Sequence, residues 1–559
     1  MPKARAAAVV LGFFLLAPAA PQAAAGDKPP KTMVFSVPSD PKTFNEMVAQ
    51  ETTSSAVTQF LFQGLTRYNP ATGEVLPLLA ERWSVSADGL VWTFDLRQDV
   101  KWSDGEPFTA EDVLFTFKDL IYNPKIVTPA RDIFTLQGKP IEVRQEGPYR
   151  IVFTLPVPFA PFLLALNQAI MPKHALAPSV TDGTFSSAWG TDENPDHIVG
   201  TGPYRLKRYV SGERIELVRN PFYWRKDSQG QALPRVDRIM LVVVPSAEGR
   251  LLKFLQGETD AYGVTGDDYP VLKEKEKQGR FILYKTGPGF GSNFVVFNQN
   301  AKDPAKKRWF QNKKFRQAMA HSLDRPSMID IIYNRLGALQ CSPESPSTPV
   351  FYNPAVNCYD YDPQAALSLL KEEGFEDRNK DGILEDAEGT PLEFVLLTNA
   401  DNPERLKIAQ MIREDIARLG IQVHLLALDF NALVSKLMVT QDWDAVLIGL
   451  TGAPDPHFGA NVWRTTGSLH FWESKENPPP SQQRIDTIFE QASEILDKDA
   501  RKKLYDEWQE IAAEELPHIY TVLPEVIYAV NSRLMNIKAS ALEGPFYEID
   551  EIDVAERPA

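Results

Sequence analysis

Hydrophobic and polar positions follow two different periods along this chain, which predicts a protein that mixes strands with helices. Residues 90–96 alternate apolar and polar side chains, the pattern of a strand with one buried face. Residues 239–244 are apolar without a break, as in a strand that is covered on both faces. Between them, Thr109 and Asp112 form a capping box ahead of apolar positions at helical spacing. We therefore expect short strands and intervening helices in the N-terminal half.

The C-terminal half alternates helices and strands, which predicts an α/β sheet. Helices are expected over residues 402–420 and 430–437, and strands over 421–425 and 443–449. The last strand opens into a long loop, residues 451–472. Because ligands of open α/β sheets bind beyond the carboxyl ends of the strands, this loop is the first candidate for a binding site.

The first residues have the pattern of a secretory signal. Lys3 and Arg5 precede an apolar stretch, residues 6–17, and an Ala-x-Ala pattern ends the segment 1–25. The apolar stretch is shorter than the about 20 residues that a membrane span needs. No cysteine follows the expected cleavage site. We therefore expect a periplasmic protein that has lost its signal peptide and carries no lipid anchor.

Composition indicates an ordered protein of more than one domain. Of the 559 residues, 43% are hydrophobic and 24% are charged, which is typical of globular chains. The formal net charge of −15 argues against a nucleic-acid partner, because binding phosphates requires a basic face.

The two cysteines, Cys341 and Cys358, flank a proline-rich loop. In an oxidising compartment we expect them to form a disulfide bond. Two free thiols or a metal-binding pair are the alternatives, but neither a Cys-x-x-Cys spacing nor a nearby histidine accompanies them.

Motifs of enzyme chemistry are absent from the sequence. It contains no Gly-x-Ser-x-Gly, no His-Glu-x-x-His and no phosphate-binding Walker loop. The seven histidines are scattered, and of these His457 and His470 lie in the candidate loop, where they could contact a ligand or serve structure alone. We therefore expect a protein that is not an enzyme and that requires no cofactor.

One segment, residues 377–388, matches the spacing of an EF-hand calcium loop. A glycine stands at its sixth position, where the loop must turn sharply. The candidate ligands are Asp377, Asn379, Asp381, the carbonyl of Ile383, Glu385 and Glu388. The flanks differ from a full EF-hand, since a strand is expected to follow the loop. The alternatives are a structural Ca²⁺ site and a polar hairpin that needs no ion.

Several ordered blocks resemble the family 5 extracellular solute-binding proteins, which include the oligopeptide- and dipeptide-binding proteins of ABC importers. The blocks are residues 40–45, 62–68, 76–83, 86–97, 100–113, 200–204 and 219–224. The resemblance implies an α/β fold of two lobes, the periplasmic binding protein fold, with an extra subdomain inserted in lobe I (the cluster C type). Lobe I would comprise residues 26–68, the inserted subdomain 69–192, residues 193–290 and a C-terminal return over 520–559. Lobe II would comprise residues 291–519.

The resemblance also implies where a peptide would bind. In peptide-binding relatives, a carboxylate pairs with the peptide amine at the place that Gly452 holds here, and in dipeptide binders an arginine stands at the place of Asn399. This chain lacks both the carboxylate and the arginine at these places. Asp455 or Asp401 could instead pair with the amine of a peptide. Further candidates for ligand contact are Phe44, Asn45 and Thr451.

Tryptophans near the candidate loop leave a second ligand class open. Trp463 and Trp472 could stack on the apolar faces of a sugar, or they could be core residues. Trp443 lies within an expected strand and is expected in the core.

The resemblance implies a monomer that closes its two lobes on a peptide or peptide-like solute and delivers it to ABC permease subunits in the inner membrane. The alternatives are a non-peptide solute, such as an oligosaccharide or an opine, and a periplasmic sensor or enzyme.

Overall fold

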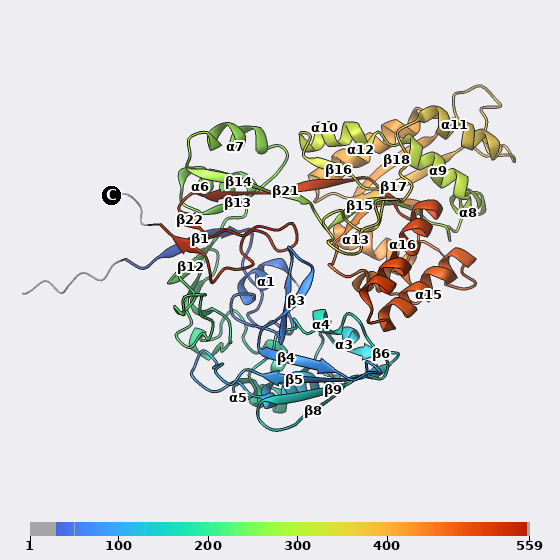
Figure 1. Ribbon diagram of the computed structural model, residues 1–559. Coiled ribbons are helices and arrows are strands. Elements are labelled where there is room, and N and C mark those ends of the chain that lie inside the picture. Colours follow the sequence, from blue (N-terminus) through green and yellow to red (C-terminus); the bar gives the residue numbers. More distant parts are fainter. Residues whose placement is uncertain (1–28, 50, 129, 474, 556–559) are drawn as a thin grey trace, which may run out of the picture.

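The computed structural model describes residues 29–555, apart from 50, 129 and 474, and it shows two lobes (Figure 1). We define lobe II as the segment from β15 (Ser292–Phe297) to β20 (Ile519–Tyr520), and lobe I as the described residues on either side of it. This confirms the expected two-lobe α/β fold. The expected signal peptide, residues 1–25, lies outside the described residues.

The central sheet of lobe I has four strands in the order β1-β12-β11-β10. They are β1 (Thr32–Val37), β12 (Arg238–Val243), β11 (Arg214–Arg219) and β10 (Tyr204–Val210). The first pair is parallel and the others are antiparallel. The expectation that residues 239–244 are covered on both faces was wrong: burial alternates along β12, because its other face remains partly exposed. The helices of this part are α1 (Thr52–Thr58), α6 (Ala247–Gln256) and α7 (Tyr269–Glu276).

A second sheet of lobe I has the order β4-β5-β9-β8, and all its pairs are antiparallel. Its strands are β4 (Ala80–Val85), β5 (Val91–Leu96), β9 (Arg150–Thr154) and β8 (Glu142–Gln145). The helices near this sheet are α2 (Ala110–Phe115), α3 (Ala130–Ile133), α4 (Phe162–Ala165) and α5 (Lys173–Thr181). Two antiparallel strand pairs lie outside the sheet. One joins β2 (Thr66–Asn69) and β3 (Glu74–Pro77), and the other joins β6 (Thr135–Leu136) and β7 (Lys139–Pro140). The capping box of Thr109 and Asp112 at the start of α2 is confirmed.

Lobe II is built on a five-stranded sheet in the order β18-β17-β19-β15-β20. Strands β18 (Gln422–Leu428), β17 (Glu393–Asn399) and β19 (Ala445–Leu450) are parallel, and β15 runs against them. The expected helix over residues 402–420 is α12 (Pro403–Ala417), which Asn402 caps. The other helices are α8 (Pro304–Gln311), α9 (Lys313–Ser322), α10 (Arg325–Tyr333), α11 (Pro363–Glu372), α13 (Phe430–Ser435), α14 (Ala460–Trp463), α15 (Pro480–Glu494) and α16 (Lys498–Glu515). Separate hydrophobic cores pack on the two faces of this sheet.

Two chain segments connect the lobes. The first passes from β14 (Phe281–Pro288) through residues 289–291 into β15, and the second passes from β20 into β21 (Val522–Asn531). Strand β21 pairs with β13 (Ala261–Val264) and β14 on the lobe I side and with β16 (Gly337–Leu339) of lobe II (Figure 1). The backbone nitrogen of Thr521 donates to the carbonyl of Asn293 at 3.0 Å, which ties the two connections together. Glycines at 289 and 291 lack side chains that would restrict backbone rotation, so the first connection can serve as a hinge.

Within the described ranges, no helix combines the length and the hydropathy that crossing a bilayer requires.

Candidate functional site

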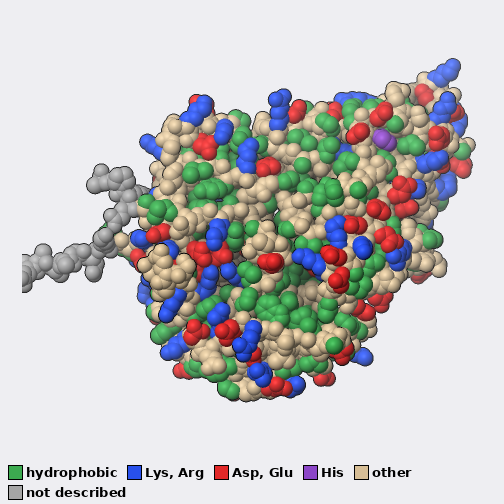
Figure 2. Space-filling model, viewed as in Figure 1, with side chains coloured by type: hydrophobic (Ala, Val, Ile, Leu, Met, Phe, Trp, Pro, Cys, Tyr) green, Lys and Arg blue, Asp and Glu red, His purple; other side chains and the backbone are tan. Residues whose placement is uncertain are grey.

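Two adjoining cavities lie where the lobes face each other. The larger has a volume of about 810 Å³ and is lined almost entirely by lobe I, while Phe458 reaches it from lobe II. The smaller has a volume of about 210 Å³, lies in lobe II and the hinge, and shares Phe458 with the larger. In the space-filling view, hydrophobic side chains form the floor of a hollow in this region of the surface (Figure 2).

The lobes touch each other beside these cavities. The backbone nitrogen of Ala160 in lobe I donates to the carbonyl of Ser493 in α15 at 2.7 Å. The amide of Gln137 donates to the carboxylate of Glu494 at 3.1 Å. The rings of Phe159 and His457 meet edge to face, with 5.1 Å between their centroids. The two lobes are therefore in direct contact with each other.

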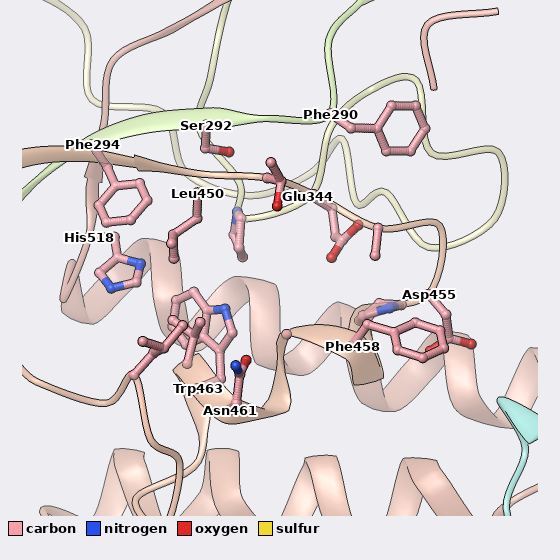
Figure 3. A pocket seen from close by; sticks show the side chains of 18 of the residues that line it. Phe290, Ser292, Phe294, Glu344, Leu450, Asp455, Phe458, Asn461, Trp463 and His518 are labelled. Atoms are coloured by element: carbon pink, nitrogen blue, oxygen red, sulfur yellow. The ribbon is translucent and has the colours of Figure 1, made fainter. Parts of the chain in front are cut away.

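The smaller cavity lies at the carboxyl end of β19, where the sequence predicted a binding site (Figure 3). Leu450 ends that strand, and Thr451 and Gly452 continue from it along the cavity wall. Phe290 comes from the hinge, and Ser292 is the first residue of β15. Much of the remaining wall is aromatic: Phe294, Phe458, Trp463, Trp508 and Tyr520.

Gly452 lies so close to the backbone of the hinge that a side chain would not fit at this position. A Cβ atom built on Gly452 would lie 2.2 Å from the carbonyl oxygen of Phe290, which is far closer than contact distance. A carboxylate side chain therefore has no room at this position, whatever group binds in the cavity.

Asp455 also lines the smaller cavity, but it already has a partner. Its two carboxylate oxygens each accept a hydrogen bond of 2.9 Å from the guanidinium of Arg501 in α16. Both side chains are only 7% exposed, and the guanidinium lies over the rings of Phe351 and Tyr505. A ligand amine would have to compete with a buried bidentate ion pair for Asp455.

Glu344 lines the same cavity and was missed by the sequence analysis (Figure 3). It lies in the loop between Cys341 and Cys358, whose predicted disulfide bond is confirmed. The amide of Gln509 in α16 holds this loop: it accepts a hydrogen bond from the Ser342 hydroxyl at 2.7 Å and donates to the backbone carbonyl of Phe351 at 2.7 Å. This loop has no strand or helix periodicity, so only the cysteine pair could have drawn attention to it.

Glu344 as a whole residue is 9% exposed, and its carboxyl group accepts a hydrogen bond of 3.3 Å from the hydroxyl of Thr348. Burial raises the pKa of Glu344 to about 8, against the lowering effect of Thr348. None of the described lysines, arginines or histidines forms an ion pair with it.

The three tryptophans occupy different places. Trp463 lines the smaller cavity and packs edge to face on Trp508, with ring centroids 5.1 Å apart. Trp472 is 1% exposed and contributes to neither cavity, because it lies in the core against Trp463 and His470. Trp443 is in the core, as expected.

Histidines contribute little charge to this region. His518 lines the smaller cavity and stacks on Phe294, and burial lowers its pKa to about 3. Burial also lowers the pKa of His457 to about 4. His457 and His470, both considered as ligand contacts, line neither cavity.

Four other candidate residues line neither cavity. Phe44 and Asn45 are fully buried in lobe I, where the Asn45 amide donates to the carbonyls of Phe185 and Ala188. Asn399 accepts a hydrogen bond of 2.6 Å from Arg405 and donates to Asp401. The side chains of Asn45 and Asn399 therefore satisfy groups of the protein itself.

The larger cavity contains paired arginines. Arg67 forms an ion pair of 2.7 Å with Glu548, and Arg225 forms one of 2.6 Å with Asp550. Asp550 also accepts a hydrogen bond of 2.8 Å from the Tyr223 hydroxyl. These arginines are therefore already neutralised.

Two further carboxylates of the larger cavity form no ion pair with any described residue. Glu46 accepts a hydrogen bond from the Thr58 hydroxyl, and burial raises its pKa. Burial also raises the pKa of Glu543, to about 7, although Arg67 opposes the rise. The titratable groups that lack an ion-pair partner in the two cavities are therefore carboxyl groups, Glu344 in the smaller cavity and Glu46 and Glu543 in the larger.

The candidate calcium loop lies on lobe II between α11 and β17. Carboxylate oxygens of Asp377, Asp381 and Glu385 lie within 4.8 Å of one another, so this set could hold a cation. Glu388 instead forms an ion pair of 2.9 Å with Arg308 and is 61% exposed. Asp377 also accepts a hydrogen bond of 3.0 Å from the backbone nitrogen of Gly382, which would stabilise a hairpin without an ion. Calcium binding remains a prediction.

Comparison with known proteins gives consistent results. The sequence model of the bacterial extracellular solute-binding proteins, family 5 Middle, matches residues 74–470. A probable ABC transporter-binding protein of Deinococcus radiodurans is 31% identical and covers 90% of this chain and 90% of its own length. The dipeptide-binding protein of Escherichia coli K12 is 28% identical and covers 87% of this chain and 88% of its own length.

Two solved structures share the fold. The oligopeptide-binding protein AppA of Bacillus subtilis, in complex with a nonapeptide, has a TM-score of 0.74 and 24% identity and covers 95% of this chain and 100% of that chain. The periplasmic binding protein MelB of Agrobacterium fabrum C58, in complex with stachyose, has a TM-score of 0.72 and 22% identity and covers 94% of this chain and 85% of that chain.

Proposed function

This chain belongs to the family 5 bacterial extracellular solute-binding proteins of ABC transporters, and we propose that it captures a peptide or peptide-like solute between its two lobes. The observation that carries the proposal is the pair of adjoining cavities, of about 810 Å³ and about 210 Å³, lined from both lobes and the hinge. AppA, which shares the fold, was solved with a nonapeptide, and the Escherichia coli relative is a dipeptide-binding protein.

Capture would work by closure of the lobes about the hinge. A solute that contacts both lobes stabilises the closed form by the difference between its affinities for the closed and the open form. In the closed form, Ala160 bonds to Ser493 and Phe159 packs on His457. Phe290, which belongs to the hinge itself, lines the smaller cavity, so a solute bound there contacts the segment that must move.

We also propose the setting in which this capture takes place. The mature protein would be a periplasmic monomer without a lipid anchor, its signal peptide 1–25 removed, that delivers the solute to permease subunits in the inner membrane. The lobe limits given above, with lobe II over residues 291–519, belong to this proposal. Neither catalysis nor a nucleic-acid partner forms part of it.

Mass spectrometry of the co-purified solute tests the proposal. The protein is purified from periplasm without added ligand and mildly denatured, and the released molecules are compared with those from a mock preparation. Peptides enriched over the mock are expected. Enrichment of another class of solute, or turnover of a solute by the purified protein, would contradict peptide capture.

An oligosaccharide is the second candidate. Trp463 lines the smaller cavity together with five other phenylalanine, tryptophan and tyrosine side chains, and aromatic faces bury the apolar faces of sugars well. MelB, of the same fold, was solved with stachyose. The same experiment distinguishes the two, since a sugar would replace the peptides among the released molecules.

A further inference from the structure

The smaller cavity holds a buried carboxyl group that has no cation beside it. Glu344 points into it, as Figure 3 shows, with the Thr348 hydroxyl as the one side-chain partner among the described residues. A buried carboxylate without a cation is costly unless something else supplies the positive charge. The Cys341–Cys358 bond and the contacts of Gln509 with its loop nevertheless hold Glu344 in this position.

The other titratable groups around Glu344 do not supply that charge. Asp455 is already neutralised by Arg501. His518 is neutral above pH 4 because burial lowers its pKa to about 3, and burial keeps Tyr520 protonated by raising its pKa. Tyr505, behind Asp455, is likewise kept protonated by burial, which raises its pKa.

The shape and the lining of the cavity also suit a cation. Phe290, Phe458, Trp463 and Tyr520 surround it, and aromatic faces attract ammonium groups. In the adjoining larger cavity the arginines are paired, whereas Glu46 and Glu543 have no ion-pair partner among the described residues. Both cavities therefore offer a cationic solute carboxyl groups that can ionise beside it, whereas they offer an anion no unpaired arginine.

We propose that the smaller cavity binds a primary ammonium group of the solute and that Glu344 is its counter-charge. The inference rests on the proposed solute-binding function and adds the chemical class of the group that is bound. A free amine is thereby required of the solute, which a neutral oligosaccharide lacks.

Binding would release a proton. Because burial raises the pKa of Glu344 to about 8, the empty cavity holds a neutral carboxylic acid at pH 7. When the ammonium group enters, the acid loses its proton to solvent and the carboxylate pairs with the ammonium. The affinity should therefore rise about tenfold between pH 6 and about 7, and level off near pH 8, where a peptide α-amine begins to lose its own proton.

The test uses the full mature chain, freed of solute by unfolding and refolding with its disulfide intact. A tryptic digest of casein is divided, and one half is acetylated at all its amines. Wild type, E344Q, E344D and the control E490Q are each given both halves, and mass spectrometry quantifies the retained peptides. Glu490 is an exposed residue of α15, so E490Q makes the same substitution of glutamate by glutamine away from the cavity.

Wild type and E490Q should retain the untreated peptides at least tenfold better than the acetylated ones. E344Q should lose this preference and E344D should keep part of it. Equal retention of both halves by wild type, or an unchanged preference in E344Q, would overturn the assignment of Glu344.

A separate outcome would bear on the proposed function instead. If wild type retained neither half, peptide capture would be refuted while the ammonium site would still be testable. Calorimetric titration with n-butylammonium chloride would then decide: binding by wild type and E490Q but not by E344Q supports the site, and the same heats from all three overturn it.

Discussion

Substitution of Glu344 by glutamine should change how the stability of the solute-free protein depends on pH. Burial raises the pKa of Glu344 from an ordinary 4.5 to about 8. The folded protein therefore holds a proton between these two pH values that the unfolded chain has lost. Raising the pH through this window must lower the free energy of unfolding, by about 1.4 kcal/mol per pH unit.

The size of the effect follows from the width of the window. Between pH 5 and pH 8, which span three pH units, Glu344 should cost wild type about 4 kcal/mol of stability. E344Q cannot ionise at this position, so it should not incur that loss. The free energy of unfolding of E344Q minus that of wild type should therefore increase by about 4 kcal/mol from pH 5 to pH 8.

Urea denaturation at pH 5, 6, 7 and 8, followed by tryptophan fluorescence, measures this difference. Trp463 and Trp508 both line the cavity and report on lobe II. E490Q controls for the substitution of a glutamate by glutamine at an exposed position and should follow wild type at every pH. If the curves of wild type and E344Q ran parallel from pH 5 to pH 8, the reasoning about a buried, uncompensated carboxylate would be refuted.

Three further predictions concern the Asp455–Arg501 pair, the disulfide bond and the candidate calcium loop. Asp455→Ala should cost about 3–5 kcal/mol in urea denaturation because it leaves the buried Arg501 unpaired, and a loss below 1 kcal/mol would contradict the geometry of the pair. Replacing both Cys341 and Cys358 by serine should cost about 3 kcal/mol, since the bridge closes a loop of 17 residues in the unfolded chain, and an unchanged denaturation midpoint would count against this. Millimolar Ca²⁺ should raise the melting temperature of wild type more than Mg²⁺ does, and Asp381→Asn should suppress the rise; equal effects of the two ions would favour the hairpin without calcium.

Local signals in the sequence predicted the elements that depend on local interactions. The capping box of Thr109 and the helix that starts after Asn402 were found because the side chains that form them are close in sequence. The disulfide bond followed from the count of cysteines and the expected compartment. The two-lobe fold was predicted from ordered blocks that resemble a known family, because the order of such blocks along the chain identifies a whole fold.

The lining of the cavity could be predicted only in part, because it depends on contacts between distant segments. The loop after β19 was expected at the site, and Thr451, Gly452, Asp455 and Trp463 do line the cavity there. Nothing in the sequence around Asp455 indicates Arg501, 46 residues away, as its partner. Likewise, Glu344 reaches the cavity only because its loop is bonded to α16, which lies more than 150 residues further along the chain.

Other residues that were predicted to contact a ligand are instead buried in the protein, and the pattern of apolar positions in the sequence does not reveal this. Trp472 and Trp463 come from the same loop, but only Trp463 meets the cavity, because the turn between them carries Trp472 into the core. Asn45 lies in a block that identifies the family, and its buried amide serves to hold two backbone carbonyls of lobe I. A block of this kind therefore marks the fold rather than the ligand.

Small-angle X-ray scattering of the solute-free and the solute-loaded protein tests most directly whether the two lobes close around a solute. The protein is stripped by unfolding and refolding, measured alone, and measured again with the solute identified by mass spectrometry. We predict a larger radius of gyration for the stripped protein, and a loaded profile that matches the closed structure, in which Ala160 bonds to Ser493. Superimposable profiles with and without solute would contradict the account.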